Sequence, residues 1–290
     1  MIKKLLMKRL LLVLILCAPV WGENVWTGDP NCVANWNCEE ASPGTYWDDS
    51  LGKQNFLSVA ASAPNDVYYK QGSQSAYKTS DFLFVQHANG NFDADYPFKS
   101  SYANPVKASV CMWVRFTSLP ASGTWHALYA HYHSSFNTRQ WMMYYYNDAG
   151  TYTFRFLKGY NGGGSFDETV SLTGTVYTDR WYHVAVTYDD TTGATRLRVW
   201  DDTAGALFSG AEVTETQAHA NDFNLSNPES LVIFGTSYPY FDYSARGWFD
   251  EIVVFNDVLT SGEIDQIRSG TYGSAAESTT SNWWWRRRHN

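Results

Sequence analysis

The sequence is short of positive charge, of cysteine and of long apolar runs. Its 290 residues include 21 Lys and Arg against 29 Asp and Glu, a formal net charge of −8. This acidic balance disfavours nucleic acid or an anionic membrane as the main partner, and it is better suited to calcium and neutral polymers. No segment after residue 22 approaches the roughly 20 apolar residues that a membrane-spanning helix needs, so we predict no transmembrane segment.

The first 22 residues have the pattern of an export signal. Four basic side chains lie within residues 3–9, a short apolar run follows at residues 10–16, and small residues at positions 20 and 22 place the cleavage before Glu23. Removal of residues 1–22 takes away four basic and no acidic residues, which changes the net charge to −12. We therefore expect a secreted, extracellular protein, with the periplasm and the cell surface as alternative destinations.

The mature chain would contain three cysteines, Cys32, Cys38 and Cys111. Export permits disulfides, but an odd number allows at most one intrachain pair. Cys32 and Cys38 are the local candidates for a disulfide, because a bond between them would close a small loop. Cys111 lies in an apolar strand, where a buried small side chain is expected.

Short runs of β-branched and aromatic residues recur along the chain, bounded by Gly, Pro, Asn and Asp, as is typical of strands. These runs cover residues 109–116, 141–146, 151–157, 181–188, 195–200, 231–234 and 249–255. Only residues 262–268 have the pattern of a helix, with capping residues on both sides. Many strands and one short C-terminal helix predict an all-β antiparallel sandwich over residues 23–273. Residues 274–290 are a predicted disordered tail that contains three Trp and three Arg.

Several of these segments resemble the motifs of a known family. Residues 181–189 (WYHVAVTYD) resemble the central strand of laminin G-like domains, and residues 247–256 (GWFDEIVVFN) resemble their last strand. Residues 258–264 are similar to the family's closing helix, and residues 36–40 and 49–55 to its opening strand and loop. The resemblance implies the jelly-roll β-sandwich of concanavalin A-like lectins and glucanases over residues 35–273.

The resemblance also implies a calcium site. In this family the opening loop and the last strand lie close together and often share an ion, which here nominates Asp49, Asn55 and Asp250. Calcium takes about six to eight oxygen ligands from carboxylates, amides and the backbone. The alternative is that Asp49 and Asn55 cap a turn and that Asp250 binds backbone amides. The expected ion is structural and has no catalytic role.

Aromatic residues make up 17% of the chain, with 13 Trp and 20 Tyr. We therefore expect some aromatic rings on the surface in addition to those in the core. Core packing is the default for Trp113, Trp181 and Phe249, yet Tyr and Trp also offer a flat apolar face and a polar edge that suit sugar rings. The Pro-interrupted, polar segment 237–246 is the strongest candidate for a ligand-binding loop. Its predicted ligand contacts are Tyr238, Tyr240, Asp242, Tyr243 and Arg246. A second platform is predicted on one face of the strand at 141–146, from Tyr144 and Tyr146.

Two patterns suggest other chemistry. His131 and His133 share a strand face and could chelate zinc, but no cysteine or carboxylate at suitable spacing completes the site, so a solvated strand face is expected. Glu263, Asp265 and Arg268 superficially resemble the motif of laminarinase-type glucanases. Their third position is not a carboxylate, and the segment lies on the closing helix, so we assign no catalytic residues.

Together these features predict a secreted, non-enzymatic binding module for a polysaccharide or a cell-surface glycan. The second hypothesis is an extracellular adhesion or structural protein that binds a protein partner, because laminin G-like domains serve both roles. A glycoside hydrolase or polysaccharide lyase is the third hypothesis. The fold alone does not select among the three.

Overall fold

The computed structural model describes residues 24–26, 28–39, 46–47, 50–51, 56–59, 62–65, 67–78, 84–85, 92–99, 101–131, 140–160, 168–218, 220–225, 231–235 and 244–273. The predicted export signal and the predicted tail lie outside these residues. Among the helices of the described part, none has the length and apolar character needed to cross a membrane.

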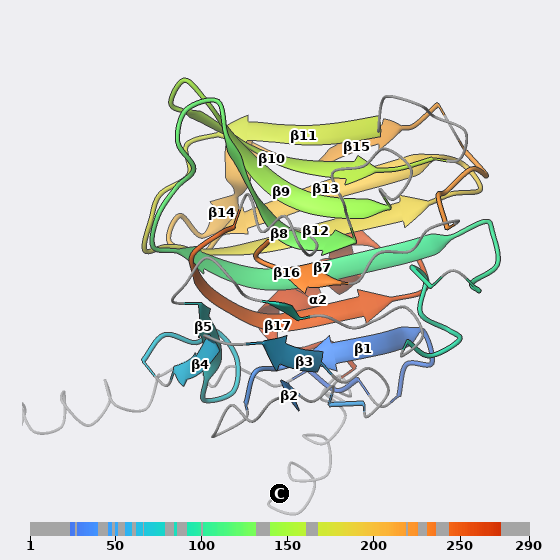
Figure 1. Cartoon of the computed structure of the whole chain (residues 1–290), viewed down its shortest axis with the longest axis horizontal. Helices are drawn as coiled ribbons and strands as arrows, with labels where there is room; N and C mark the ends of the chain where they lie inside the picture. Colours follow the sequence, from blue (N-terminus) through green and yellow to red (C-terminus); the bar gives the residue numbers. More distant parts are fainter. Residues whose placement is uncertain are drawn as a thin grey trace, which may run out of the picture.

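Antiparallel sheets form a layered sandwich, with the five-stranded sheet in front of the nine-stranded sheet in Figure 1. The strands of the nine-stranded sheet are β1 (Cys32–Trp36), β4 (Ser62–Asn65), β5 (Ser75–Lys78), β7 (Lys107–Phe116), β12 (Trp181–Asp189), β13 (Ala194–Asp201), β14 (Ala206–Leu207), β15 (Val213–Thr216) and β17 (Gly247–Phe255). Their order is β14-β13-β12-β7-β17-β5-β4, and β1 and β15 pair with β17 and β13. A 3-10 turn, η3 (Phe208–Gly210), follows β14.

The five-stranded sheet has the order β11-β10-β9-β8-β16. Its strands are β8 (Trp125–His131), β9 (Trp141–Asp148), β10 (Thr151–Lys158), β11 (Glu168–Gly174) and β16 (Val232–Ile233). Ala149 and Gly150 connect β9 to β10 with positive φ angles of 49° and 96°, as expected for a tight hairpin turn. A third sheet consists of β2 (Tyr46–Trp47), β3 (Phe56–Val59) and β6 (Phe84–Val85).

The main core lies between the two large sheets. Alternate side chains of β7, β12 and β17 point into it, and the five-stranded sheet contributes large aromatic residues from the other side. Those of the five-stranded sheet that are fully buried include Tyr129, Trp141, Tyr145 and Phe156, and Tyr182 meets them from β12. The long segment that precedes β7 adds Phe92, Tyr96 and Phe98, all at most 2% exposed. Residues 92–98 thereby belong to the core of the sandwich.

The helix α2 (Ser261–Ser269) covers part of the outer face of the nine-stranded sheet (Figure 1). Thr260 caps its first turn through the amide of Glu263, whose side chain bonds back to the Thr260 amide in a capping box. Gly270 ends the helix in the left-handed conformation, with φ of 70°. Ile264 and Ile267 are the buried residues of α2. The helix therefore forms where the capping residues predict it.

The two ends of the described chain meet beside α2. The amide of Val25 donates to the carbonyl of Tyr272 at 2.8 Å, and the amide of Tyr272 donates to Asn24 Oδ1 at 2.9 Å. Trp26 stacks on Tyr272 with ring centroids 5.4 Å apart. Strand β1 continues this contact by pairing with β17, from Cys32 opposite Phe255 to Trp36 opposite Ile252. We call the contact of residues 24–26 with residue 272 the terminal clasp.

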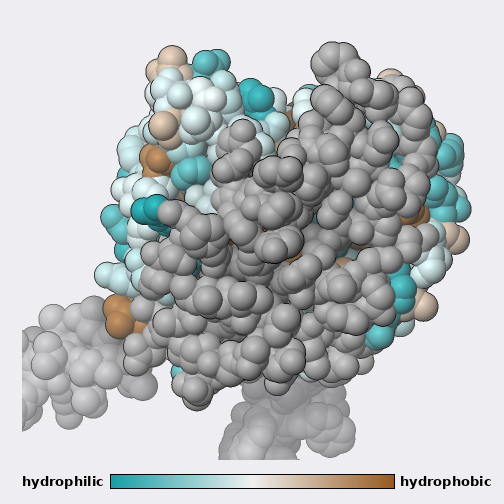
Figure 2. All heavy atoms as spheres, in the orientation of Figure 1, coloured by the Kyte–Doolittle hydropathy of each residue, from teal (hydrophilic) through white to brown (hydrophobic). Residues whose placement is uncertain are grey.

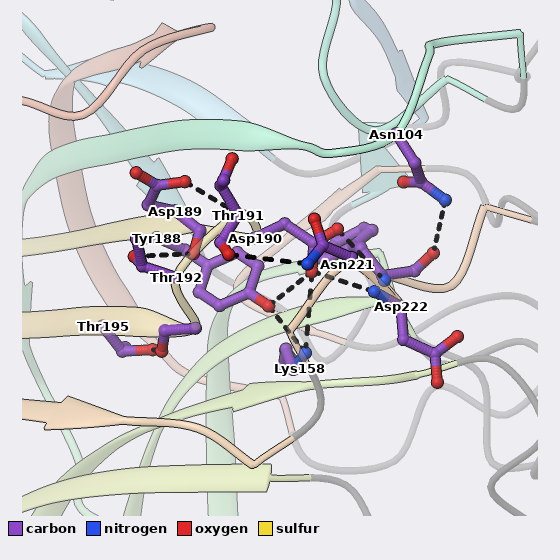
Figure 3. A network of polar contacts seen from close by, with 12 residues as sticks. Asn104, Lys158, Tyr188, Asp189, Asp190, Thr191, Thr192, Thr195, Asn221 and Asp222 are labelled. Atoms are coloured by element: carbon purple, nitrogen blue, oxygen red, sulfur yellow. Dashed lines mark hydrogen bonds and ion pairs between the residues drawn. The ribbon is translucent and has the colours of Figure 1, made fainter.

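A buried polar network ties three loops together at one end of the sandwich (Figure 3). Lys158 and Asp190 are both fully buried. Lys158 Nζ donates to the Tyr188 hydroxyl at 2.6 Å, and this hydroxyl donates to Asp190 Oδ1 at 2.7 Å. Asp190 also accepts from the amides of Asp222 and Phe223 at 3.3 Å and 3.5 Å. The carboxylate therefore orders residues 221–223 against the end of β12.

We predict that Asp190→Ala lowers the free energy of unfolding by about 3–5 kcal/mol, because it removes a buried charge that pairs with Lys158 and accepts from two backbone amides. Asp222→Ala is the matched control, since its carboxylate points away from the network in Figure 3, and it should change stability by about 0.5 kcal/mol or less. Urea denaturation followed by fluorescence measures both. Equal effects of the two substitutions would contradict the assigned role of Asp190.

Candidate functional site

The outward face of the five-stranded sheet gathers aromatic, hydroxyl and guanidinium side chains. Alternate residues of a strand share a face, so the register places outward residues in rows across β8, β9, β10 and β11. One row is Trp125, Tyr146, Thr153 and Thr173. The next row is Ala127, Tyr144, Arg155 and Ser171. The two tyrosines thus share the outward face, while their neighbours in the strand, Met143 and Tyr145, lie in the main core.

Ring contacts arrange the aromatic part of this face. Trp125 meets Tyr144 edge-on with centroids 5.6 Å apart, and the Arg155 guanidinium carbon lies 4.7 Å from the centre of the Tyr146 ring. Tyr144 is only 7% exposed, whereas Trp125, Tyr146 and Arg155 are partly exposed. Tyr144 therefore supports the surface, and a ligand would meet Trp125, Tyr146 and Arg155.

Hydroxyl groups and a guanidinium lie in the same two rows as these rings. Arg155 Nε is buried and has no hydrogen-bond partner. On the edge strand β11, Ser171 and Thr173 are exposed, and the Thr173 hydroxyl is bonded to that of Thr153 at 3.1 Å. Flat rings beside hydroxyl groups and a guanidinium suit a ligand that has an apolar face and many hydroxyl groups.

The predicted aromatic loop ends beside the same face. Ser244 forms a parallel bridge with Ala127, and Ala127 pairs with Tyr144. Arg246 is exposed at the end of this loop, and its carbonyl accepts a hydrogen bond from the amide of Thr117. The other predicted contacts of the loop lie outside the described residues: Tyr238, Tyr240, Asp242 and Tyr243. Figure 2 shows this side of the molecule, where most described atoms have neutral to hydrophilic colours.

Asp250, predicted as a calcium ligand, is fully buried on β17. Its Oδ2 accepts from the amides of Lys70 at 2.8 Å and Gln71 at 3.2 Å, and its Oδ1 accepts from the amide of Glu251 at 2.9 Å. The carboxylate therefore holds the segment before β5 against the last strand. These contacts agree with the alternative prediction, in which Asp250 binds backbone amides. Asp49 and Asn55 lie outside the described residues.

A polar cavity of about 310 Å³ adjoins Glu251, the neighbour of Asp250 on β17. Its polar lining includes Asn35, Glu39, Ser50 and Glu251. Burial raises the pKa of Asp250 well above its ordinary value, and the negative charges of Glu251 and Glu39 raise it further. A cation in the cavity would offset this repulsion. In the described part of the chain, however, no three Asp, Glu, His or Cys side chains converge in a metal-binding arrangement.

The predicted disulfide between Cys32 and Cys38 is wrong. No bond joins them, because they pack on opposite faces of the nine-stranded sheet. Cys32 lies with Cys111 in the apolar cluster beneath α2, whereas Cys38 lies in the main core. The short sequence separation is therefore misleading, since side-chain direction decides whether two sulfur atoms meet. Cys111 is buried, as predicted, and burial raises the pKa of its thiol.

The prediction of a solvated face at His131 is also wrong. His131 is fully buried, and its Nε2 lies 3.0 Å from the hydroxyl of Tyr96, which lies 2.5 Å from the hydroxyl of Tyr129. Residues 92–98 cover this part of the sheet, which the strand pattern could not reveal. His133 lies outside the described residues.

The carboxylates of the closing helix have structural partners. Glu263 forms the capping box of α2, and Asp265 pairs with Arg198 at 2.6 Å and with Arg268 at 3.3 Å. These contacts explain the motif without a catalytic role. Sequence reasoning missed Trp125 and Arg155 as parts of the outward face. The signal available for Trp125 and Arg155 was their period-two alternation with apolar residues.

Comparison with known proteins agrees with the sandwich. A sequence-family model described as the concanavalin A-like lectin/glucanases superfamily matches residues 89–265. Domain 4 of AbnA, a GH43 extracellular arabinanase from Geobacillus stearothermophilus solved with arabinotriose, is 13% identical and covers 82% of this chain and 98% of its own, with a TM-score of 0.50.

A second solved structure is more distant in shape. The CBM40 of the Ruminococcus gnavus IT-sialidase, solved with α2,3 sialyllactose, is 18% identical and covers 58% of this chain and 83% of its own, with a TM-score of 0.43. At these identities the likeness concerns the fold alone. No curated protein sequence matches this chain.

We predict that Asp250→Ala lowers the free energy of unfolding by about 3 kcal/mol, because three backbone amides lose their shared acceptor. Asp250→Asn keeps one acceptor oxygen and should lose about half as much. Asp148→Ala, at the exposed end of β9, is the control and should lie within about 0.5 kcal/mol of the wild type. Chemical denaturation in EDTA measures all three, and an Asp250→Ala variant as stable as the control would contradict the role.

Proposed function

The chain belongs to the concanavalin A-like lectin/glucanases superfamily, and on this basis we propose that it is a secreted carbohydrate-binding module. Its ligand is a polysaccharide or a cell-surface glycan, bound on the outward face of the five-stranded sheet. Secretion rests on the export signal predicted in residues 1–22. The protein acts by binding, and no catalytic residue is assigned to it.

One observation carries the proposal: the strand tyrosines and the end of the aromatic loop meet at Ala127. This residue pairs with Tyr144 on one side and bridges to Ser244 on the other. The strand that carries Tyr144 and the described end of the loop at Ser244, about 100 residues apart in the sequence, therefore meet at one strand. A sugar ring presents an apolar face to Tyr146 and Trp125 and hydroxyl groups to Arg155.

The dimensions of the face suit more than one sugar unit. The row from Trp125 to Thr173 crosses four strands, or roughly 14 Å at about 4.8 Å per strand spacing. Aromatic groups lie at one end of this row and hydroxyl groups at the other. The arabinanase domain solved with arabinotriose is an example of the same fold that holds a short glycan.

A structural calcium ion near the polar cavity is the second part of the proposal. Glu39 and Glu251 would supply carboxylate oxygens, and Asp49 and Asn55 remain predicted ligands from the opening loop. The ion would offset the repulsion that raises the pKa of Asp250. Its role would be to fix the opening segment against β17.

We expect a glycan array probed with the full chain to give reproducible binding to one glycan class. Tyr146→Ala and Trp125→Ala should each weaken that binding about tenfold, because each removes a stacking ring worth about 1 kcal/mol or more. Tyr102→Ala, at a partly exposed tyrosine in the segment before β7, is the control for loss of a ring elsewhere on the molecule. A blank array, or equal binding by all three variants, would overturn the proposal.

Calcium should raise the melting temperature by roughly 5 °C relative to EDTA, because an ion bound only to the folded state stabilises it. Glu251→Gln should reduce this increase, whereas Glu215→Gln, on the exposed edge strand β15, should preserve it. Differential scanning fluorimetry measures the shift. The same melting temperature in calcium and in EDTA would contradict a calcium site.

A further inference from the structure

The outer face of the nine-stranded sheet carries a second aromatic surface. Beside the area that α2 covers, β7, β12 and β17 place Trp113, Trp181 and Trp248 in one buried group, with Tyr77 and Trp200 at its margins. We call these five residues the tryptophan cluster. The cluster lies on the opposite side of the sandwich from Tyr146, because Trp248 and the core residue Phe249 point to opposite faces of β17.

Arg115 lies in the middle of this cluster. On β7 it is registered opposite Trp181 on one side and Trp248 on the other. Its guanidinium carbon lies 3.9 Å from the centre of the Tyr68 ring and 5.1 Å from that of Trp248. Aromatic faces therefore cover the flat sides of the guanidinium and leave its edge to make hydrogen bonds.

The Arg115 guanidinium makes few hydrogen bonds along that edge. The Arg115 side chain is 15% exposed, and its single hydrogen bond within the described residues runs from Nη2 to Asp179 at the long distance of 3.4 Å. Arg115 Nε has no partner, nor have the indole nitrogens of Trp113 and Trp248 and the Nε2 of His183. Unpaired buried polar atoms are costly, and three of these four are donors that lack an acceptor.

His183 packs against Trp113 with ring centroids 5.0 Å apart, and its pKa is lowered to about 3. Burial is the main cause, and the positive charges of Arg268, Arg198 and Lys70 add to it. These three cations are paired with Asp265 and Asp202, so the Arg115 guanidinium is the group of the cluster with weak pairing.

An exposed ring flanks Arg115. The structure leaves five large apolar side chains exposed in its described part, and three of them lie in the segment 67–69. Tyr68 contacts Arg115 directly, whereas Tyr177, two residues before Asp179, packs on the Arg180 guanidinium. The Tyr68 ring therefore borders the Arg115 guanidinium and would stack on the apolar face of a sugar ring.

We propose that this surface is a second ligand site, which binds a carboxylate-bearing sugar such as a uronic acid. The carboxylate binds the Nη end of the Arg115 guanidinium, where Asp179 now bonds Nη2, and the sugar ring packs on Tyr68. Asp179 now occupies part of this position, so a ligand carboxylate displaces it. The net charge of −8 opposes dense polyanions. The favoured ligand is therefore a glycan in which acidic and neutral sugars alternate.

The test uses the full chain, a hyaluronan tetrasaccharide and the same oligosaccharide after carboxyl reduction, with calorimetry and tryptophan fluorescence as readouts. The native tetrasaccharide should bind at least tenfold more tightly than its reduced form. Arg115→Gln should weaken its binding at least tenfold. Lys107→Gln removes the same charge at the far end of β7, where Lys107 pairs with Asp189, and should leave binding unchanged.

The Asp179→Asn variant tests binding of the oligosaccharide without an expected change in folding. Asp179 is 66% exposed and has a φ of 62°, which asparagine tolerates, so the variant should fold as the wild type does. Removal of the competing carboxylate should tighten binding about threefold. Unchanged or weaker binding by Asp179→Asn would overturn the proposal, as would equal affinity for the reduced oligosaccharide or no binding of the native one.

Discussion

The hydrogen-bonded ladder of β12, β7 and β17 is the constraint on which the rest of the structure depends. All nine residues of β17 are buried, and β7 and β12 are buried over nearly their whole length. Strands buried on both faces need a cover on each side. The five-stranded sheet supplies one cover, and α2 together with the tryptophan cluster supplies the other. The two sides of the ladder are therefore covered by two different layers, each with its own outer surface.

This arrangement separates two kinds of aromatic surface. On the five-stranded sheet, Tyr146 and Trp125 lie outside a complete core, so their exposure costs the fold little. On the nine-stranded sheet, Trp113 and Trp248 seal the ladder itself, and Arg115 is enclosed among them. A ligand on the first face would add contacts to a finished structure. A ligand on the second would complete hydrogen bonds that the fold leaves unmade.

Much of the sandwich could be predicted from local patterns. The strands at residues 109–116, 181–188 and 249–255 and the capped helix appear close to their predicted bounds, because alternation and caps are local signals. The direction of Cys32 and Cys38 depends on which sheet face each one meets, and the burial of His131 depends on residues 92–98. Such contacts between distant segments leave no periodic signature. The pairing of Ala127 with both Tyr144 and Ser244 is also a contact between distant segments, and the sequence did not predict it. Each of the two aromatic segments could be recognised by itself.

The terminal clasp determines how the domain would respond to force. Because residues 24–26 are bonded to residue 272, tension applied through the two ends would act first on that clasp. Strand β1 would then be peeled from the Phe255 end of β17, with its hydrogen bonds breaking in succession. The ladder of β12, β7 and β17 and both aromatic faces would carry little of the load. The domain could therefore be held under tension between two attachment points while its two broad faces stay folded and open to ligands.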